Sequence, residues 1–228
     1  QKSLEIAQPE RDTTSMIAGY ANIGGVLKLG ENHQLSLEYA YKALELARII
    51  DHKPYLAKIT NNIGNYYSNN DQQDSARILY RQAIKLKREL NLDRTLAISI
   101  SNLGGTYVDG PHHDSADLYL DEAYALATTL NYPFARILPL RYKAHNDLQQ
   151  GKHQESIRWS KEGIDIVKQT PGNRYFKEFH DVISESYQAL NHPDSALAYL
   201  KITAALKDSI HHAEKELQIK QLELAKRE

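Results

Sequence analysis

The sequence predicts an all-α protein, a right-handed solenoid of about five stacked helical hairpins. Three observations predict it: small residues recur every 40 positions, each repeat holds two stripes of apolar residues at helical spacing, and a polar break separates the stripes. A repeat of this length cannot bury its apolar face alone, so neighbouring repeats must stack. The core should therefore run along the whole array.

Three columns of small residues define the repeat. The second column lies twelve positions after the first, and the third lies nineteen positions after the first. A small side chain at a fixed place lets two helix backbones approach closely. The columns are Gly24, Gly64, Gly104, Ala144 and Ser184; Ser36, Ala76, Ala116, Ser156 and Ala196; and Ala43, Ala83, Ala123, Gly163 and Thr203.

The second repeat shows the hairpin most plainly. One apolar helical stripe runs from Ile59 to Tyr67 and another from Ala76 to Leu86, with the polar run 69–73 between them. The text Asp-Ser-Ala follows this break at residues 74–76 and recurs in other repeats, where an N-cap for the second helix is expected. Helix stop and start signals separate the repeats at residues 51–54, 91–93, 131–133 and 170–173.

The ends of the chain divide it into three segments. Residues 1–10 are expected to be the end of a truncated preceding repeat, because Ser3 to Ala7 match Ala43 to Ala47. Residues 11–205 are expected to form the five-repeat solenoid. Residues 206–228 are a charged C-terminal helix with heptad-like apolar spacing over barely three heptads. Two interpretations stay open for it: a coiled-coil linker that forms a homodimer, and a capping helix with a solvated tail. The apolar positions are Ile210, Ala213, Leu217 and Leu224.

The pattern resembles the tetratricopeptide repeat (TPR). The family signature is a small residue followed by an aromatic residue, then A-x3-F and a further alanine. Residues 63–67 read Ile-Gly-x-x-Tyr, followed by Ala-x3-Tyr at 76–80 and Ala83. The period of 40 instead of 34 resembles a long-helix subset of the family. The fourth repeat departs from the pattern, because Lys143 and Asp147 replace the apolar and aromatic landmarks.

In this family the first helix of each hairpin lines a concave groove that holds peptides. The resemblance implies that the residue two places before each small landmark points into the groove, and in three repeats this residue is asparagine. An asparagine side chain can pair with both the N–H and the C=O of an extended peptide. The alternative is that these amides are solvated or bond to the next repeat. The candidate groove residues are Asn22, Lys58, Asn61, Asn62, Asn65, Asn102, Arg141, Tyr142 and His145.

Composition narrows the classes of function. The chain has 28 basic and 29 acidic residues, which argues against nucleic-acid binding through a broad basic surface. It has no cysteine and no apolar run long enough to span a membrane, so a membrane could be reached only through segments outside this chain. No P-loop, nucleophile elbow or dinucleotide turn is present, so catalysis and a cofactor are not expected. The histidines are too dispersed to predict a metal site.

The end of the array also resembles the extracytoplasmic repeat regions of bacterial two-component sensor kinases and membrane-bound transcription regulators. The text Leu-Lys-Asp-Ser-Ile at residues 206–210, followed by the charged helix, supports this resemblance. It implies a non-catalytic, periplasmic input domain that binds a peptide or protein ligand and signals through the C-terminal helix to an output domain outside the chain. The alternatives are a cytoplasmic scaffold or adaptor that binds partner tails, and a quorum-peptide receptor.

Overall fold

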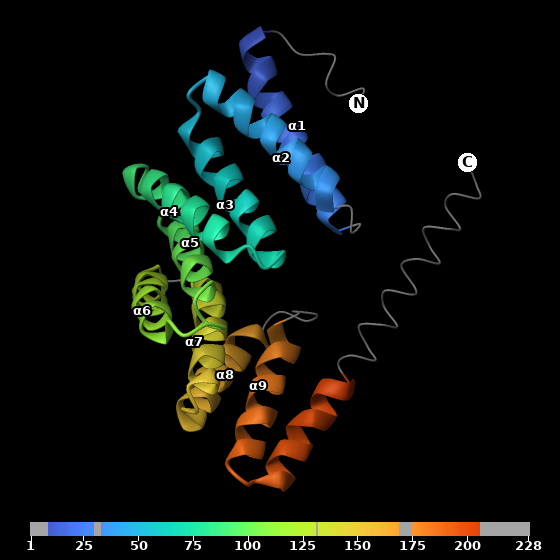
Figure 1. Ribbon diagram of the computed structural model, residues 1–228, viewed down its shortest axis with the longest axis vertical. Helices are drawn as coiled ribbons and strands as arrows, with labels where there is room; N and C mark the ends of the chain where they lie inside the picture. Colours follow the sequence, from blue (N-terminus) through green and yellow to red (C-terminus); the bar gives the residue numbers. More distant parts are fainter. Residues whose placement is uncertain (1–8, 30–32, 131, 169–174, 206–228) are drawn as a thin grey trace, which may run out of the picture.

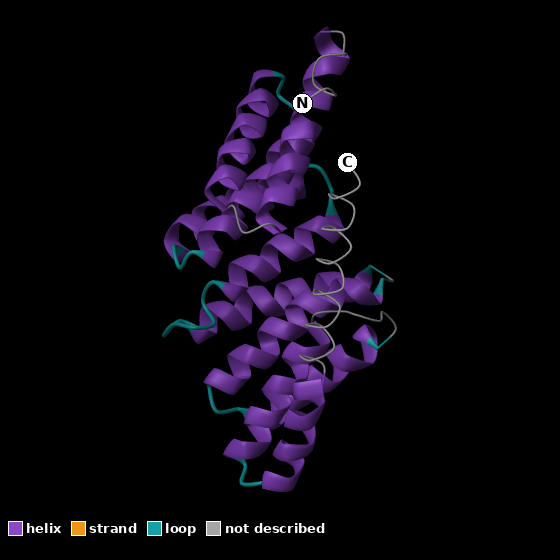
Figure 2. Cartoon of the chain, turned by 90° about the vertical axis from the view of Figure 1, so that its right-hand side faces the viewer, coloured by secondary structure: helices purple, strands orange, loops and turns teal. Residues whose placement is uncertain are grey.

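The computed structural model describes residues 9–29, 33–130, 132–168 and 175–205 (Figure 1). Every regular element in these ranges is helical, which confirms the predicted fold class (Figure 2). A last helical segment spans residues 193–205. The other elements are α1 (Pro9–Leu29), α2 (His33–Ile49), α3 (Lys53–Asn69), α4 (Gln73–Glu89), α5 (Asp93–Gly105), α6 (His113–Thr129), the 3-10 helix η2 (Pro133–Arg136), α7 (Ile137–Gln149), α8 (His153–Val167) and α9 (Tyr175–Ala189).

The helices form antiparallel hairpins that stack in chain order. Within a hairpin, α1 packs on α2, α3 on α4, α5 on α6 and α7 on α8. The second helix of each hairpin then packs on the first helix of the next, as α4 does on α5 and α8 does on α9. The first helix α7 also touches both α5 and α9 directly, so these three first helices form a continuous layer of the solenoid.

The small residues of the first column lie against large side chains of the second helix. A Cβ atom added to Gly64 would lie 2.8 Å from Tyr80 Cε1, and one added to Gly104 would lie 2.9 Å from Leu120 Cδ2. The repeat columns alone would pair Gly64 with Ala76 and Gly104 with Ala116, but the tightest contact lies one helical turn further along. Tyr80 and Leu120 hold the A-x3-F position, whose large side chain fills the space that the glycine leaves.

The turns between helices use residues in the left-handed conformation. Asp71, Gly151 and Asn191 have positive φ at the turns inside hairpins, where Asn, Asp and Gly are tolerated. The predicted N-cap at Asp74 is wrong. Gln72 holds the N-cap without a side-chain hydrogen bond, and Asp74 lies in the first turn of α4, where a carboxylate favours the helix N-terminus.

The turn of the third hairpin differs from the others. Its position forty residues after Asp71 is Pro111, whose ring fixes φ near −65° and excludes the left-handed conformation. Helix α5 ends early, at Gly105, and residues 106–112 form an irregular turn. Arg77 Nη2 donates a hydrogen bond of 2.7 Å to the carbonyl oxygen of Thr106, which stabilises this early end.

The fourth repeat replaces its missing aromatic landmark with a polar cluster. Trp159 Nε1 donates to Asp147 Oδ2 at 2.9 Å, and burial raises the pKa of that carboxyl group. The Lys143 ammonium lies over the Trp159 ring at 4.6 Å and forms an ion pair with Asp121. These contacts of Trp159 and Lys143 take the place of the missing aromatic residue, so the two helices of the fourth repeat still pack together.

A buried lysine joins three helices in the middle of the array. Lys87 of α4 is only 4% exposed, and its ammonium donates to Thr95 O at 2.9 Å and to Ser99 Oγ at 2.6 Å, both on α5. Ser99 Oγ in turn donates to Asn61 Oδ1 of α3 at 2.6 Å. Burial of the ammonium lowers the pKa of Lys87 to about 8.

The segment boundaries at the two ends are only partly covered by the described residues. Helix α1 begins at Pro9, two residues inside the stretch assigned to a preceding repeat. Residues 1–8 and 206–228, including the heptad-like stripe, lie outside the described residues.

Gly104→Leu is expected to overpack the contact with Leu120 and to lower the free energy of unfolding by about 1–3 kcal/mol. Gly110→Leu is the control, because the nearest atom to an added Cβ there is Tyr107 O at 3.9 Å. Chemical denaturation of both variants measures the difference. Equal stability of the two variants would contradict the assigned packing.

Lys87 makes the stability of the protein dependent on pH. Its pKa is lower in the folded state than in the unfolded state, so the unfolded chain binds more protons above pH 8 and stability should rise with pH. Relative to Lys87→Met, the wild type should gain up to about 2 kcal/mol between pH 7.5 and pH 9.5. A pH-independent difference between the two unfolding free energies would show that the ammonium is not penalised by burial.

Candidate functional site

Three of the candidate amides connect neighbouring helices. Asn61 is buried and accepts the hydrogen bond from Ser99. Asn65 Oδ1 accepts from the Tyr80 hydroxyl at 2.8 Å and from Asn102 Nδ2 at 3.0 Å. These contacts link α3 to α4 and α5, so they stabilise the stack of repeats.

The predicted asparagine ladder is therefore not uniform. Asn102 is 8% exposed and its amide is bonded to Asn65, whereas Asn22 and Asn62 are exposed at the matching positions of α1 and α3. Lys58 is also exposed, one turn before Asn62 on the same side of α3. Asn22 and Asn62 are therefore the asparagines of the ladder whose amides remain available to a ligand.

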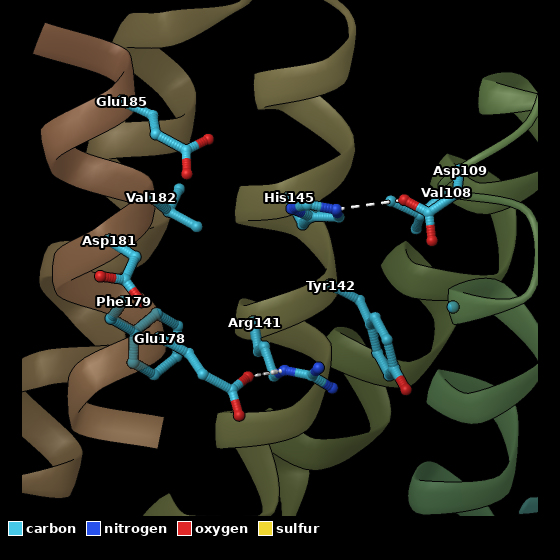
Figure 3. Close-up of a pocket in the computed structure, with 11 residues that line it drawn as sticks. Val108, Asp109, Arg141, Tyr142, His145, Glu178, Phe179, Asp181, Val182 and Glu185 are labelled. Atoms are coloured by element: carbon cyan, nitrogen blue, oxygen red, sulfur yellow. Dashed lines mark hydrogen bonds and ion pairs between the residues drawn. The ribbon is translucent and has the colours of Figure 1, made fainter. Parts of the chain in front are cut away.

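The structure brings Arg141, Tyr142 and His145 together at a hollow between α5, α7 and α9 (Figure 3). The hollow has a volume of about 360 Å³, within the range of small ligand sites in proteins. All three residues belong to α7. The other lining residues are Gly105, Val108, Asp109, Glu178, Phe179, Asp181, Val182 and Glu185.

Arg141 is held in place by its neighbours. Its guanidinium forms an ion pair with Glu178 and lies 4.7 Å from the centre of the Tyr142 ring and 5.7 Å from that of Tyr175. Burial alone would lower the pKa of Arg141, but the Tyr142 phenol and the Glu178 carboxylate raise it above its usual value. The guanidinium is thus fixed as a cation whose charge is already compensated by α9.

Tyr142 fits against the backbone of α5. A Cβ atom added to Gly105 would lie 2.5 Å from Tyr142 Cζ, so only glycine leaves room for the ring. Burial raises the pKa of the Tyr142 phenol. The ring fills the space beside Gly105 and forms one wall of the hollow, whereas Val108 and Val182 supply apolar surface.

The hollow has more carboxylates than cations. His145 Nε2 lies 3.1 Å from Asp109 Oδ1, and Asp181 Oδ2 accepts from Lys177 Nζ at 2.6 Å. Glu185 is exposed and has no ion pair within the described part of the chain. Four carboxylates therefore face one arginine and one histidine, and the lining is acidic.

Sequence reasoning missed the acidic side of the hollow. Glu178, Asp181 and Glu185 are spaced three and four positions apart on α9, which is helical spacing on one face and was visible in the sequence. Asp109 had no such signal, because its position depends on the early end of α5. The described residues contain no group of three or more histidine, cysteine, aspartate or glutamate side chains placed to hold a metal ion.

The comparisons with known proteins agree with this architecture. The model of the family described as "Tetratricopeptide repeat" matches residues 13–89. No curated protein sequence is detectably similar to the chain. None of the described helices combines the length and the apolar character needed to span a membrane.

Solved structures share the fold at low sequence identity. BtubC (BKLC) from P. vanneervenii has a TM-score of 0.74 and 14% identity, covering 92% of this chain and 89% of that chain. A putative kinesin light chain from Podosopora anserina with nearly identical TPR-like repeats has a TM-score of 0.66 and 14% identity, covering 90% and 100%. A Rap protein complexed with Competence and Sporulation Factor has a TM-score of 0.77 and 16% identity, covering 88% of this chain and 57% of that chain.

The repeat signature, the stacked hairpins and the structural neighbours lead to one assignment. The family model covers the first two hairpins, and the same hairpin geometry continues through α9. Residues 13–89 match the tetratricopeptide-repeat family, and the described part of the chain shares the fold of solved TPR-like solenoids.

Proposed function

We propose that this protein binds a peptide or an exposed protein segment in the hollow between α5, α7 and α9. The repeat fold is a protein-interaction fold, and the hollow is the observation that supports binding at this place. A Rap protein that shares this fold was solved in complex with Competence and Sporulation Factor, which supports a binding role for this chain. The acidic lining favours a ligand with lysine or arginine side chains.

The geometry suggests how one cationic side chain would bind. Val108 and Val182 offer apolar surface for its methylene groups, and Asp109 and Glu185 offer carboxylates for its charged end. Arg141 is already paired with Glu178, so it would repel the cation less than an unpaired arginine. The exposed side chains of Lys58 and Asn62 on α3 remain candidates for contacts with the ligand backbone.

Within this proposal the protein is an input domain of a bacterial signalling protein. Ligand binding across three first helices would change the curvature of the array, and residues 206–228 would pass that change to an output domain outside the chain. The input domain would lie in the periplasm. Protease treatment of spheroplasts that express the full-length gene tests the compartment, since protection of the repeats until the cells are lysed would favour a cytoplasmic adaptor.

Asp109→Asn combined with Glu185→Gln should weaken the binding of a lysine-rich peptide pool about fivefold or more, because two partly exposed charges contribute about 0.5–1 kcal/mol each. Fluorescence anisotropy with a labelled pool measures the affinity, and a glutamate-rich pool of equal length should bind more weakly to the wild type. Glu45→Gln is the control, since Glu45 is an exposed carboxylate on α2, away from the hollow. Equal affinity of both pools for the wild type would contradict the cationic ligand.

Asn62 and Asn102 occupy the same position in successive repeats and form a matched pair. Asn102→Ala should lower the free energy of unfolding by about 1 kcal/mol, because it removes the hydrogen bond to Asn65. Asn62→Ala should leave stability unchanged and weaken peptide binding, because the Asn62 side chain is exposed. Melting curves together with the same anisotropy titration separate the two roles. A large loss of stability in Asn62→Ala would instead make Asn62 part of the repeat interface.

A further inference from the structure

The last described helical segment has an apolar face that the described residues leave about half exposed. Ala196 and Thr203 are buried against α9, and Tyr199 packs partly on the cluster around Phe179. On another side of the same helix, Leu197 and Leu200 are 50% and 54% exposed. We call Leu197, Leu200 and Ala204 the end face.

The end face holds positions that earlier repeats bury. Forty residues earlier, these positions are Ile157, Ser160 and Ile164, all of which are buried. Ile157 and Ile164 share a core cluster with Phe179 and Ile183 of α9, the first helix of the next hairpin. The end face is therefore equivalent to the surface on which the next hairpin of the solenoid would pack. Among the described residues, no helix occupies that place.

The charges beside the end face make it complementary to itself. Asp194 and Lys201 are seven positions apart, so they lie on the same side of the helix, two turns from each other. Both are exposed, and neither forms an ion pair within the described ranges. Suppose that this helix packs antiparallel to the same helix of a second copy, with a two-fold axis near Leu197. Asp194 of each copy then lies opposite Lys201 of the other.

We propose that the end face pairs with the end face of a second copy of this chain. Leu197 and Leu200 from both copies would form the apolar centre, and two Asp194–Lys201 ion pairs would fix the antiparallel register. The interface is isologous, so it closes as a dimer. This contact differs from pairing through the stripe in residues 206–228, which would bring the C-terminal segments together in parallel.

Sedimentation velocity of the 228-residue chain over a range of concentrations tests the proposal. The wild type should show a concentration-dependent dimer, and Leu197→Glu with Leu200→Glu should remain monomeric with an unchanged helical circular dichroism spectrum. Ile202→Glu is the matched control, because Ile202 is 40% exposed on the same helix at a position that Glu162 and Glu122 hold in earlier repeats. The control should still form dimers.

Charge exchange tests the register of the pair. Asp194→Lys and Lys201→Asp should each weaken the dimer, and the two changes together should restore it, because the opposite charges then face each other again. A wild type that is monomeric at all concentrations overturns the proposal. A dimer that survives the change of Leu197 and Leu200, or one that is lost only with Ile210→Glu and Leu217→Glu, overturns it as well.

Discussion

The close approach of packed helices at three glycines, within hairpins and between them, is the constraint on which the stacked structure depends. Gly64 and Gly104 lie directly against Tyr80 and Leu120, and Gly163 lies against Phe179 of the following hairpin, with 2.2 Å between its virtual Cβ and the Phe179 ring. A side chain at these glycines would push the helices apart. Since every hairpin packs on the next, a shift at one contact would also change how the first helices line up.

Much of the fold could be predicted from the sequence because the repeat constrains it. The period of 40 residues, the small columns and the apolar stripes predict hairpins, their order and their stacking, and all of these are present. The partner of each glycine could not be predicted, because spacing alone does not separate Ala76 from Tyr80 one turn later. The N-cap prediction failed for a similar reason, since the left-handed Asp71 places the helix start two residues earlier.

The candidate site was harder to predict because equivalent positions have different surroundings. Asn62 and Asn102 hold the same place in the repeat, yet one is exposed and the other bonds to Asn65. The amides of α3 thus include one that is available to a ligand, Asn62, and two that connect helices, Asn61 and Asn65. Arg141, Tyr142 and His145 do meet at one hollow, but its acidic side depends on the early end of α5, which places Asp109, and on α9. A departure from the repeat, and not the repeat itself, shapes the hollow.

The central claim is that the glycine column sets the distance between helices through specific large partners. A double-mutant cycle with Gly104→Leu and Leu120→Ala tests it most directly, by chemical denaturation of the wild type, both single variants and the double variant. The claim predicts that the double variant is more stable than the sum of the two losses by about 1 kcal/mol or more, because the new leucine occupies the space left by the old one. Additive losses, within about 0.5 kcal/mol, would contradict it.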